Sequence, residues 1–188
     1  DVIVVTIAAK LSGTYQGAVL AKDMVEGINI HVVDSKSVSY GQMYLVLEAI
    51  EMIKKGMNAE DIFNKLNELR ENITIYVLVD TLKYLVKNGR LSATSGFLGT
   101  LLKIKPLLKI MEDGSLQPYE KIRTTNRARK RLMEIINEEI KGKEALVFLA
   151  HTNNKDETEV IKKELLENHN NIEVLVVPLT PVVGAHAG

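Results

Sequence analysis

The stretch Lys10-Leu11-Ser12-Gly13-Thr14-Tyr15-Gln16-Gly17-Ala18 directly follows an apolar run over residues 2–7. A short run rich in β-branched residues, then a small polar turn and a helical pattern, predicts a strand, a turn and a helix. In α/β sheets, ligands bind beyond the carboxyl end of a strand, at the amino end of the next helix. Gly13 would let a ligand approach the backbone closely, and Ser12 and Thr14 offer hydroxyls that could hydrogen-bond to it. The same residues also suit a plain helix cap, so this stretch alone leaves both interpretations open.

Composition limits the classes of function. The 188 residues suffice for one domain or two small ones, and 46% hydrophobic with 26% charged residues is ordinary for a soluble protein. The 24 basic and 24 acidic residues cancel, which gives no support to a nucleic-acid partner. The absence of cysteine excludes disulfides, thiol catalysis and cysteine metal sites. No apolar run is long enough to span a bilayer and no signal peptide is visible, so we expect a cytoplasmic protein.

The first part of the chain follows a β-α-β-α-α pattern. After the strand at residues 2–7 we expect a helix over 14–25, a strand over 28–33 and a long amphipathic helix over 40–55. Another helix begins at Asn58, with Asp61 in the capping-box position. This order predicts an α/β domain with a mostly parallel sheet.

The second part changes character. An apolar strand over 73–79, which we expect to be central, leads into a short helix that includes residues 80–85 and ends near Gly89. A small-residue helix over 93–102 follows. Residues 107–111 and 116–122 flank Asp113-Gly114 and predict a β-hairpin. A basic helix over 126–140 precedes a strand, helix and strand at 145–150, 155–167 and 172–177. We therefore predict the remainder of a first α/β domain at 1–71, an α+β domain at 72–177 and a C-terminal loop at 178–188.

Few residues stand out as candidates for chemistry. No phosphate-binding loop, nucleophile elbow or histidine metal motif is present. His186 lies among glycines, where it could donate to a carboxylate or phosphate, or could be a surface residue at a frayed end. Asp34 and Ser35 suit either a turn or support for a ligand's head group. Arg90 could hold an anion or simply be solvated.

Five stretches together resemble the DegV family of bacterial fatty-acid-binding proteins, the lipid-carrying subunit of fatty acid kinase. The first is Leu11-Ser12-Gly13-Thr14-Tyr15-Gln16, and the last is Pro181-Val182-Val183-Gly184-Ala185-His186. Between them lie Val33-Asp34-Ser35 with Ser39 and Gly41, the segment from Val79-Asp80-Thr81 through Gly89-Arg90-Leu91-Ser92, and Ile104-Lys105-Pro106 with Asp113-Gly114 and Lys121-Ile122-Arg123-Thr124. They occur in the family's order over nearly the whole chain.

This resemblance implies two α/β domains that enclose one acyl chain in a buried tunnel, without enzymatic activity of their own. Ser12, Gly13 and Thr14 would form the carboxylate site together with His186, and the C-terminal segment would return to that inter-domain site. The candidates for the tunnel lining are Phe97, Leu98, Leu101 and Ile104, for which membership of the ordinary hydrophobic core is the alternative. No cofactor or metal is implied; the ligand is a long-chain fatty acid.

The implied partner is a kinase subunit that binds ATP and phosphorylates the presented carboxylate. Arg90, Lys121 and Arg123 are the candidates for docking that subunit, and transient contact with a membrane is compatible with such a carrier. The family begins with a further α/β segment that this chain lacks, so we expect an N-terminally truncated member.

Two other functions remain open at this stage. One is an enzyme for a small carboxylate or phosphate, with His186 as acid or base near Ser12 and Asp34. The other is a regulatory α/β domain without a ligand.

Overall fold

The computed structural model describes residues 1–91 and 105–188. The predicted helix over 93–102 and the four tunnel candidates Phe97, Leu98, Leu101 and Ile104 lie outside these residues. The chain divides into two compact units. Among the described residues, unit 1 comprises Asp1–Tyr76, 90–91 and Lys109–Gln117, and unit 2 comprises Val77–Gly89, 105–108 and Pro118–Gly188.

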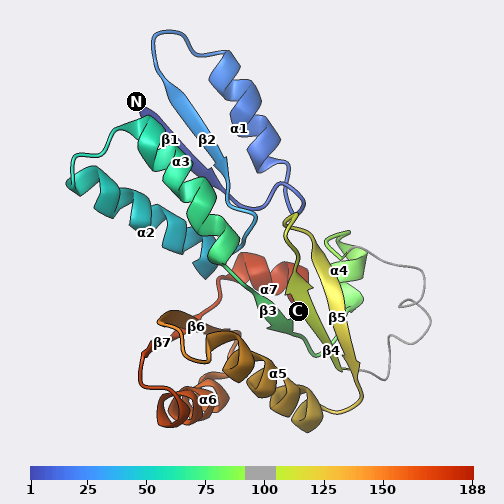
Figure 1. The fold of residues 1–188 in the computed structure, drawn as a ribbon. Helices are drawn as coiled ribbons and strands as arrows, with labels where there is room; N and C mark the ends of the chain where they lie inside the picture. The colour runs from blue at the N-terminus through green and yellow to red at the C-terminus, as the bar shows by residue number, and fades with distance from the viewer. Residues whose placement is uncertain (92–104) are drawn as a thin grey trace. The chain divides into compact units, whose positions relative to one another are not determined.

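Unit 1 is built on two parallel strands, β1 (Val2–Thr6) and β2 (Ile30–Asp34). Helix α1 (Thr14–Asp23) connects them, and α2 (Tyr40–Lys54), α3 (Ala59–Leu69) and a short 3-10 helix, η1 (Arg70–Asn72), follow. In Figure 1, α2 and α3 lie against one face of the strand pair and α1 lies on the other. This β-α-β-α-α order is the predicted one.

The core of unit 1 lies between β1–β2 and the helices α2 and α3. Its buried members are Val33, Leu45, Ala49, Met52, Ile62 and Leu66. Val33 belongs to β2, and the other five recur at helical spacing on one side of α2 or α3, which explains why these segments fold as amphipathic helices. The Asn58 side chain accepts a hydrogen bond from the Asp61 N–H at 2.9 Å, so the expected cap of α3 is confirmed.

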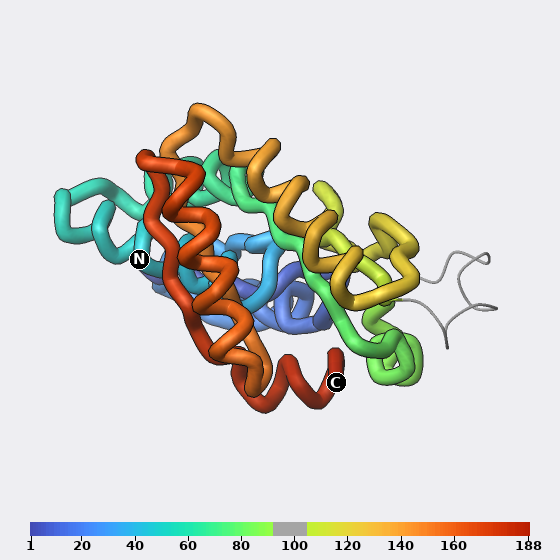
Figure 2. Tube along the Cα trace, turned by 90° about the horizontal axis from the view of Figure 1, so that it is seen from below, coloured from blue at the N-terminus to red at the C-terminus, as the bar shows by residue number. Residues whose placement is uncertain are grey.

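Unit 2 contains a second parallel pair, β6 (Ala145–His151) and β7 (Ile172–Pro178). Helix α6 (Lys155–Asn168) connects the two strands, and α5 (Thr125–Ile140) precedes them. Met133, Ile140, Ile161, Leu165 and Val174 form the core of this layer. Figure 2 follows the trace from α6 through β7 into α7 (Pro181–Ala187), near whose end the C-terminus lies.

A three-stranded sheet has the order β3 (Tyr76–Leu78), β4 (Lys105–Ile110) and β5 (Leu116–Ile122). Helix α4 (Lys83–Lys87) follows β3. Because β4 and β5 are neighbours joined by a tight turn at Asp113-Gly114, the predicted hairpin is present. Within this described sheet β4, not β3, is the middle strand, so the expectation of a central strand over 73–79 was wrong. Three half-buried residues make up β3, and an apolar run cannot distinguish an edge strand from a central one.

The structure also differs from the expected boundaries. Residues 109–117, at the tip of the hairpin, belong to unit 1, and the chain passes between the units within β3, β4 and β5. The expectation of a loop over 178–188 was wrong, because Pro178 ends β7 and Pro181–Ala187 form α7. Pro181 occupies the first helical position, where its fixed φ suits a helix and its missing N–H is not needed. Proline and glycine indicate a loop within a segment, but proline at its start is equally compatible with a helix.

Candidate functional site

Two loops in unit 1 leave the same edge of the strand pair. Thr6 and Asp34 are register partners at the carboxyl ends of β1 and β2. The loop that leads to α1 carries Ser12 and Gly13, and the loop that leads to α2 carries Ser35. A parallel pair thus places the loop candidates of unit 1 at the position where α/β sheets bind ligands.

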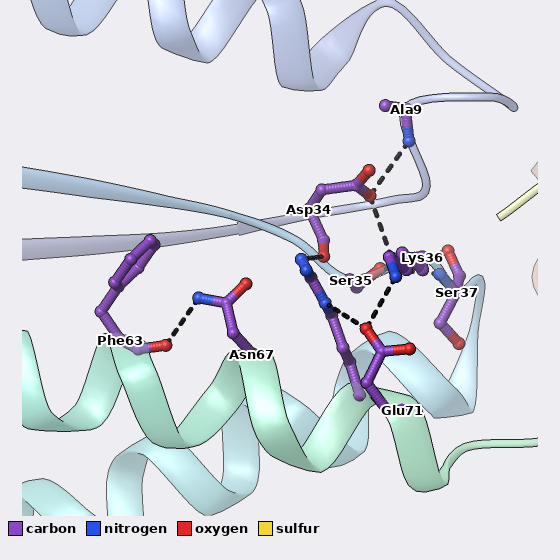
Figure 3. A network of polar contacts seen from close by, with 9 residues as sticks. Ala9, Asp34, Ser35, Lys36, Ser37, Phe63, Asn67 and Glu71 are labelled. Carbon is purple, nitrogen blue, oxygen red and sulfur yellow. Dashed lines mark hydrogen bonds and ion pairs between the residues drawn. The ribbon is translucent and has the colours of Figure 1, made fainter. Parts of the chain in front are cut away.

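Asp34 ties the two loops together. Its Oδ1 accepts hydrogen bonds from the Ala9 N–H at 3.1 Å and the Lys36 N–H at 2.9 Å (Figure 3). Its backbone oxygen accepts from Arg70 Nη1 at 2.7 Å. Since one carboxylate oxygen receives two backbone amides from different loops, Asp34 supports the loops themselves. Ser35 is fully buried and its hydroxyl bonds the backbone of Ser37, so it holds the second loop from within.

Ser12 lies just before helix α1. Its Oγ accepts from the Thr14 N–H at 3.3 Å and shares a hydrogen bond of 2.8 Å with Thr14 Oγ1. The capping interpretation of this stretch therefore has a real basis. Ser12 is half-buried, while Gly13 and Thr14 are exposed, and a Cβ at Gly13 would meet no atom within 4 Å. The described residues leave room in front of this turn, and the roles of Ser12, Gly13 and Thr14 toward a carboxylate remain predictions.

The turn of the β4–β5 hairpin packs against both loops, which sequence reasoning did not anticipate. At Gly114, φ is +81°, and a Cβ there would lie 3.1 Å from Ala8 Cβ and 3.2 Å from Lys36 Cα. Hydrogen bonds from Ser115 lower the pKa of Asp113, and the charge of Lys10 lowers it further. The Asp-Gly pair identified a turn, but no local signal could reveal what it would pack against.

Lys36, Arg70 and Glu71 form a second network that the sequence did not reveal. Lys36 Nζ lies 2.7 Å and Arg70 Nε lies 3.1 Å from Glu71 Oε1. The hydrogen bond from Lys36 is the largest cause that lowers the pKa of Glu71. Since Arg70 also donates to Asp34, the network links the end of α3 to the loop after β2 (Figure 3).

His186 lies in the last turn of α7, in unit 2. Its side chain is half-buried, and Nδ1 is buried without a hydrogen-bond partner among the described residues. A buried ring nitrogen without a partner is unusual, because such groups normally make a hydrogen bond. The other three histidines have partners within their own units: His31 contacts Asn29 and Phe63, His151 accepts from the Asn154 N–H, and His169 bonds Asn137.

The three basic candidates lie on the surface. Arg90 follows Gly89, whose φ of +65° ends the turn after α4, and Arg90 is exposed. Lys121 is in β5 and Arg123 follows it, and both are exposed. Their role in docking a partner remains a prediction.

Two searches of the described ranges, 1–91 and 105–188, gave negative results. No group of three or more His, Asp or Glu side chains there could hold a metal ion. In the same residues, every helix is too short or too polar to cross a bilayer.

Comparison with known proteins identifies the family. The family model described as "Uncharacterised protein, DegV family" matches residues 1–188. This chain belongs to the DegV family. A DegV domain-containing protein from Staphylococcus aureus is 37% identical over 190 residues, an alignment that covers all of this chain and 66% of that protein. The chain therefore spans about two thirds of the length of the curated DegV relatives it matches.

Solved DegV structures share the fold. A fatty acid binding DegV family protein from Streptococcus agalactiae superimposes with a TM-score of 0.87 at 32% identity, over 99% of this chain and 66% of that one. DegV from Bacillus subtilis, described as a fatty acid binding protein, gives a TM-score of 0.87 at 33% identity, over 100% and 67%. The mixed α/β fold expected for DegV is confirmed. These descriptions are consistent with a carrier rather than a catalyst.

Proposed function

We propose that this chain binds a long-chain fatty acid and presents its carboxylate to a separate kinase subunit that makes the acyl phosphate. The observation that carries the proposal is the likeness to DegV proteins described as fatty acid binding, which extends over the whole chain. Membership of the DegV family supports a shared ligand class, while the kinase step rests on the resemblance stated above.

The candidate residues have the chemistry that a carboxylate requires. The Ser12 hydroxyl can turn from Thr14 to donate to an anion. The Nδ1 of His186, which has no partner within residues 1–91 and 105–188, offers a second donor when protonated. A charge-assisted hydrogen bond contributes ~1.5–3 kcal/mol. Burial of a sixteen-carbon chain contributes about 12 kcal/mol gross, at ~0.8 kcal/mol per methylene. The acyl chain would therefore provide most of the affinity, and Ser12 and His186 would orient the head group.

The charged candidates suit the partner step. Arg90, Lys121 and Arg123 are exposed cations that could attract an acidic surface of the kinase. Charge reversal at these residues is expected to weaken complex formation while fatty acid binding persists.

The test is native mass spectrometry of the purified chain, followed by identification of what organic solvent extracts from it. A stoichiometric fatty acid is the expected result. A protein that is empty and takes up neither added oleate nor palmitate would contradict the proposal. In Ser12→Ala and His186→Ala, oleate affinity should fall about tenfold or more for each, as loss of a charge-assisted bond predicts.

Thr152→Ala is the matched control, because Thr152 carries an exposed hydroxyl and is none of the candidate site residues. Its oleate affinity should equal that of the unmodified chain. Circular dichroism should show that all three variants keep their helix content. Unchanged affinity in both Ser12→Ala and His186→Ala would remove these two residues from the site.

A further inference from the structure

The short helix α7 is held against α4 by a contact directly before His186. Asn88, the residue that ends α4, donates from Nδ2 to the backbone oxygen of Ala185 at 3.2 Å. Ala185 immediately precedes His186, so this bond acts on the turn that carries the imidazole. Both helices belong to unit 2.

A second contact lies directly beyond His186. A Cβ on Gly188 would lie 2.8 Å from Cδ2 and 3.2 Å from Cε2 of Tyr84, which is itself part of α4. The backbone after the histidine therefore lies so close to the Tyr84 ring that a side chain at residue 188 would collide with it. Contacts with α4 thus flank His186 on both sides.

Among the described elements, helix α7 packs chiefly against α4. It has seven residues and none of them is buried. A helix of less than two turns is not stable in water by itself, and helices in proteins depend on packing of an apolar face. Val183, His186 and Ala187 form a half-buried face of α7, and no residue of the helix is fully buried. Its position therefore depends on discrete contacts such as those with Asn88 and Tyr84 as well as on this face.

We propose that Asn88 and Tyr84 are positioning residues that fix the orientation of the His186 imidazole. The positioning role concerns His186 alone, and the identity of the ligand that His186 binds rests on the proposed function. Asn88 acts through its side-chain N–H, which donates to the carbonyl oxygen of Ala185. An acceptor atom in the place of this N–H would be repelled by that oxygen. Tyr84 acts through the carbon atoms of its ring, so its hydroxyl is dispensable.

The experiment records the Cε1–H signals of the four histidines by NMR in the full chain, with His186→Gln used to assign the His186 signal. Asn88→Ala and Asn88→Asp should shift the His186 signal, with the larger shift for Asp because its carboxylate repels the Ala185 oxygen. Tyr84→Ala should also shift it, and the conservative variant Tyr84→Phe should restore the original position. The signals of His31, His151 and His169 should stay in place.

Asn170→Asp is the matched control, because Asn170 is an exposed amide elsewhere in unit 2. Like Asn88→Asp, this variant replaces an amide by a carboxylate of the same shape, and it should leave the Cε1–H signals of all four histidines unchanged. In oleate titrations, Asn88→Ala should bind about threefold to tenfold more weakly, the range expected for loss of one hydrogen bond. Thermal unfolding of each variant checks that unit 2 remains folded.

An unchanged His186 signal in both Asn88→Asp and Tyr84→Ala would overturn the inference. So would equal shifts of all four histidines, since that result would indicate a general loss of structure. If the unmodified chain fails to bind oleate while the His186 signal still responds to Asn88, the proposed function fails and the positioning role stands.

Discussion

At the scale of single residues, the turn between β2 and α2 depends on close packing. Ser39, the N-cap of α2, has φ 56° and ψ −123°, a region that non-glycine residues rarely occupy. Such a conformation costs ~1–3 kcal/mol and persists only where the surroundings impose it. The side chains of Asp34 and Ser35 accept hydrogen bonds from the Lys36 and Ser37 N–H groups, and so hold the backbone that leads into Ser39.

Gly41, in the first turn of α2, has no room for a side chain. A Cβ there would collide with Ser37 Oγ and lie 3.0 Å from Ile73 Cγ2 and 3.2 Å from Ile75 Cδ1. Gly41→Ala is therefore expected to lower the free energy of unfolding by ~1–3 kcal/mol, the cost of overpacking. Urea unfolding followed by circular dichroism measures the change.

A control and a rescue test this explanation. At Gly17, inside α1, a Cβ would meet nothing within 4 Å, so Gly17→Ala should stabilise the helix by ~0.5–1 kcal/mol. Ser37→Ala removes the hydroxyl that obstructs Gly41, and combined with Gly41→Ala it should recover part of the loss. Equal stability of Gly41→Ala and the unmodified chain would show that the turn relaxes freely.

At the scale of elements, charged side chains join α3 and η1 to the loop after β2. Lys36 and Arg70 both contact Glu71, and Arg70 also contacts the backbone of Asp34. Exposed pairs of this kind are screened by water and contribute only ~0.2–1 kcal/mol each. The Lys36–Glu71 pair can nevertheless be recognised by its dependence on pH.

Bonding to Lys36 lowers the pKa of Glu71 below its ordinary value of 4.5 in the folded chain. Around these pKa values, the folded state then binds fewer protons than the unfolded state. The contribution of the Lys36–Glu71 pair to the free energy of unfolding is therefore complete above the ordinary pKa, and it is lost as the pH falls through the pKa of the folded state. We expect Glu71→Gln to have a lower free energy of unfolding than the unmodified chain near neutral pH. On acidification to about pH 3, the free energy of unfolding should fall less in Glu71→Gln than in the unmodified chain. Urea midpoints across this range measure the effect.

Glu26→Gln serves as the control, since Glu26 is exposed and has no ion-pair partner among the described residues. Its acid dependence should match that of the unmodified chain. Parallel curves for Glu71→Gln and the unmodified chain would contradict the assigned role of Glu71.

At the scale of the whole molecule, a ligand that binds only the folded chain must stabilise it. At a free concentration about one hundred times Kd, the gain is ~2.7 kcal/mol. We therefore expect oleate to raise the midpoint of thermal unfolding of the unmodified chain. The same concentration of oleate should raise the midpoint of the His186→Ala variant less. Differential scanning fluorimetry with increasing oleate measures both.

Methyl oleate separates the acyl chain from the carboxylate. It keeps the apolar tail and removes the charge, so it should stabilise the chain less than oleate at the same concentration. Equal stabilisation by the two compounds would mean that the head group is not recognised. No stabilisation by oleate would contradict the proposed function as a whole.

The sequence by itself determined the fold class, the family and most of the helices and strands. These depend on local information: the 3.6-residue and two-residue periods of apolar side chains, the Asn58 cap, the Asp113-Gly114 turn and motifs in a recognisable order. It also indicated that Asp34 would serve as either loop support or ligand support, without deciding between them. The helical nature of residues 181–187 was missed because proline and glycine have different meanings at the start of a helix and within it.

Only the tertiary structure decided which side chains meet. It placed Gly114 against Ala8, Arg70 against Asp34 and Asn88 against Ala185, and it made β4 the middle strand of its sheet. These partners lie tens of residues apart in the chain, and each contact forms only after apolar burial has brought whole elements together. Periodicity and spacing carry no record of such encounters, because they describe each segment against its own neighbours.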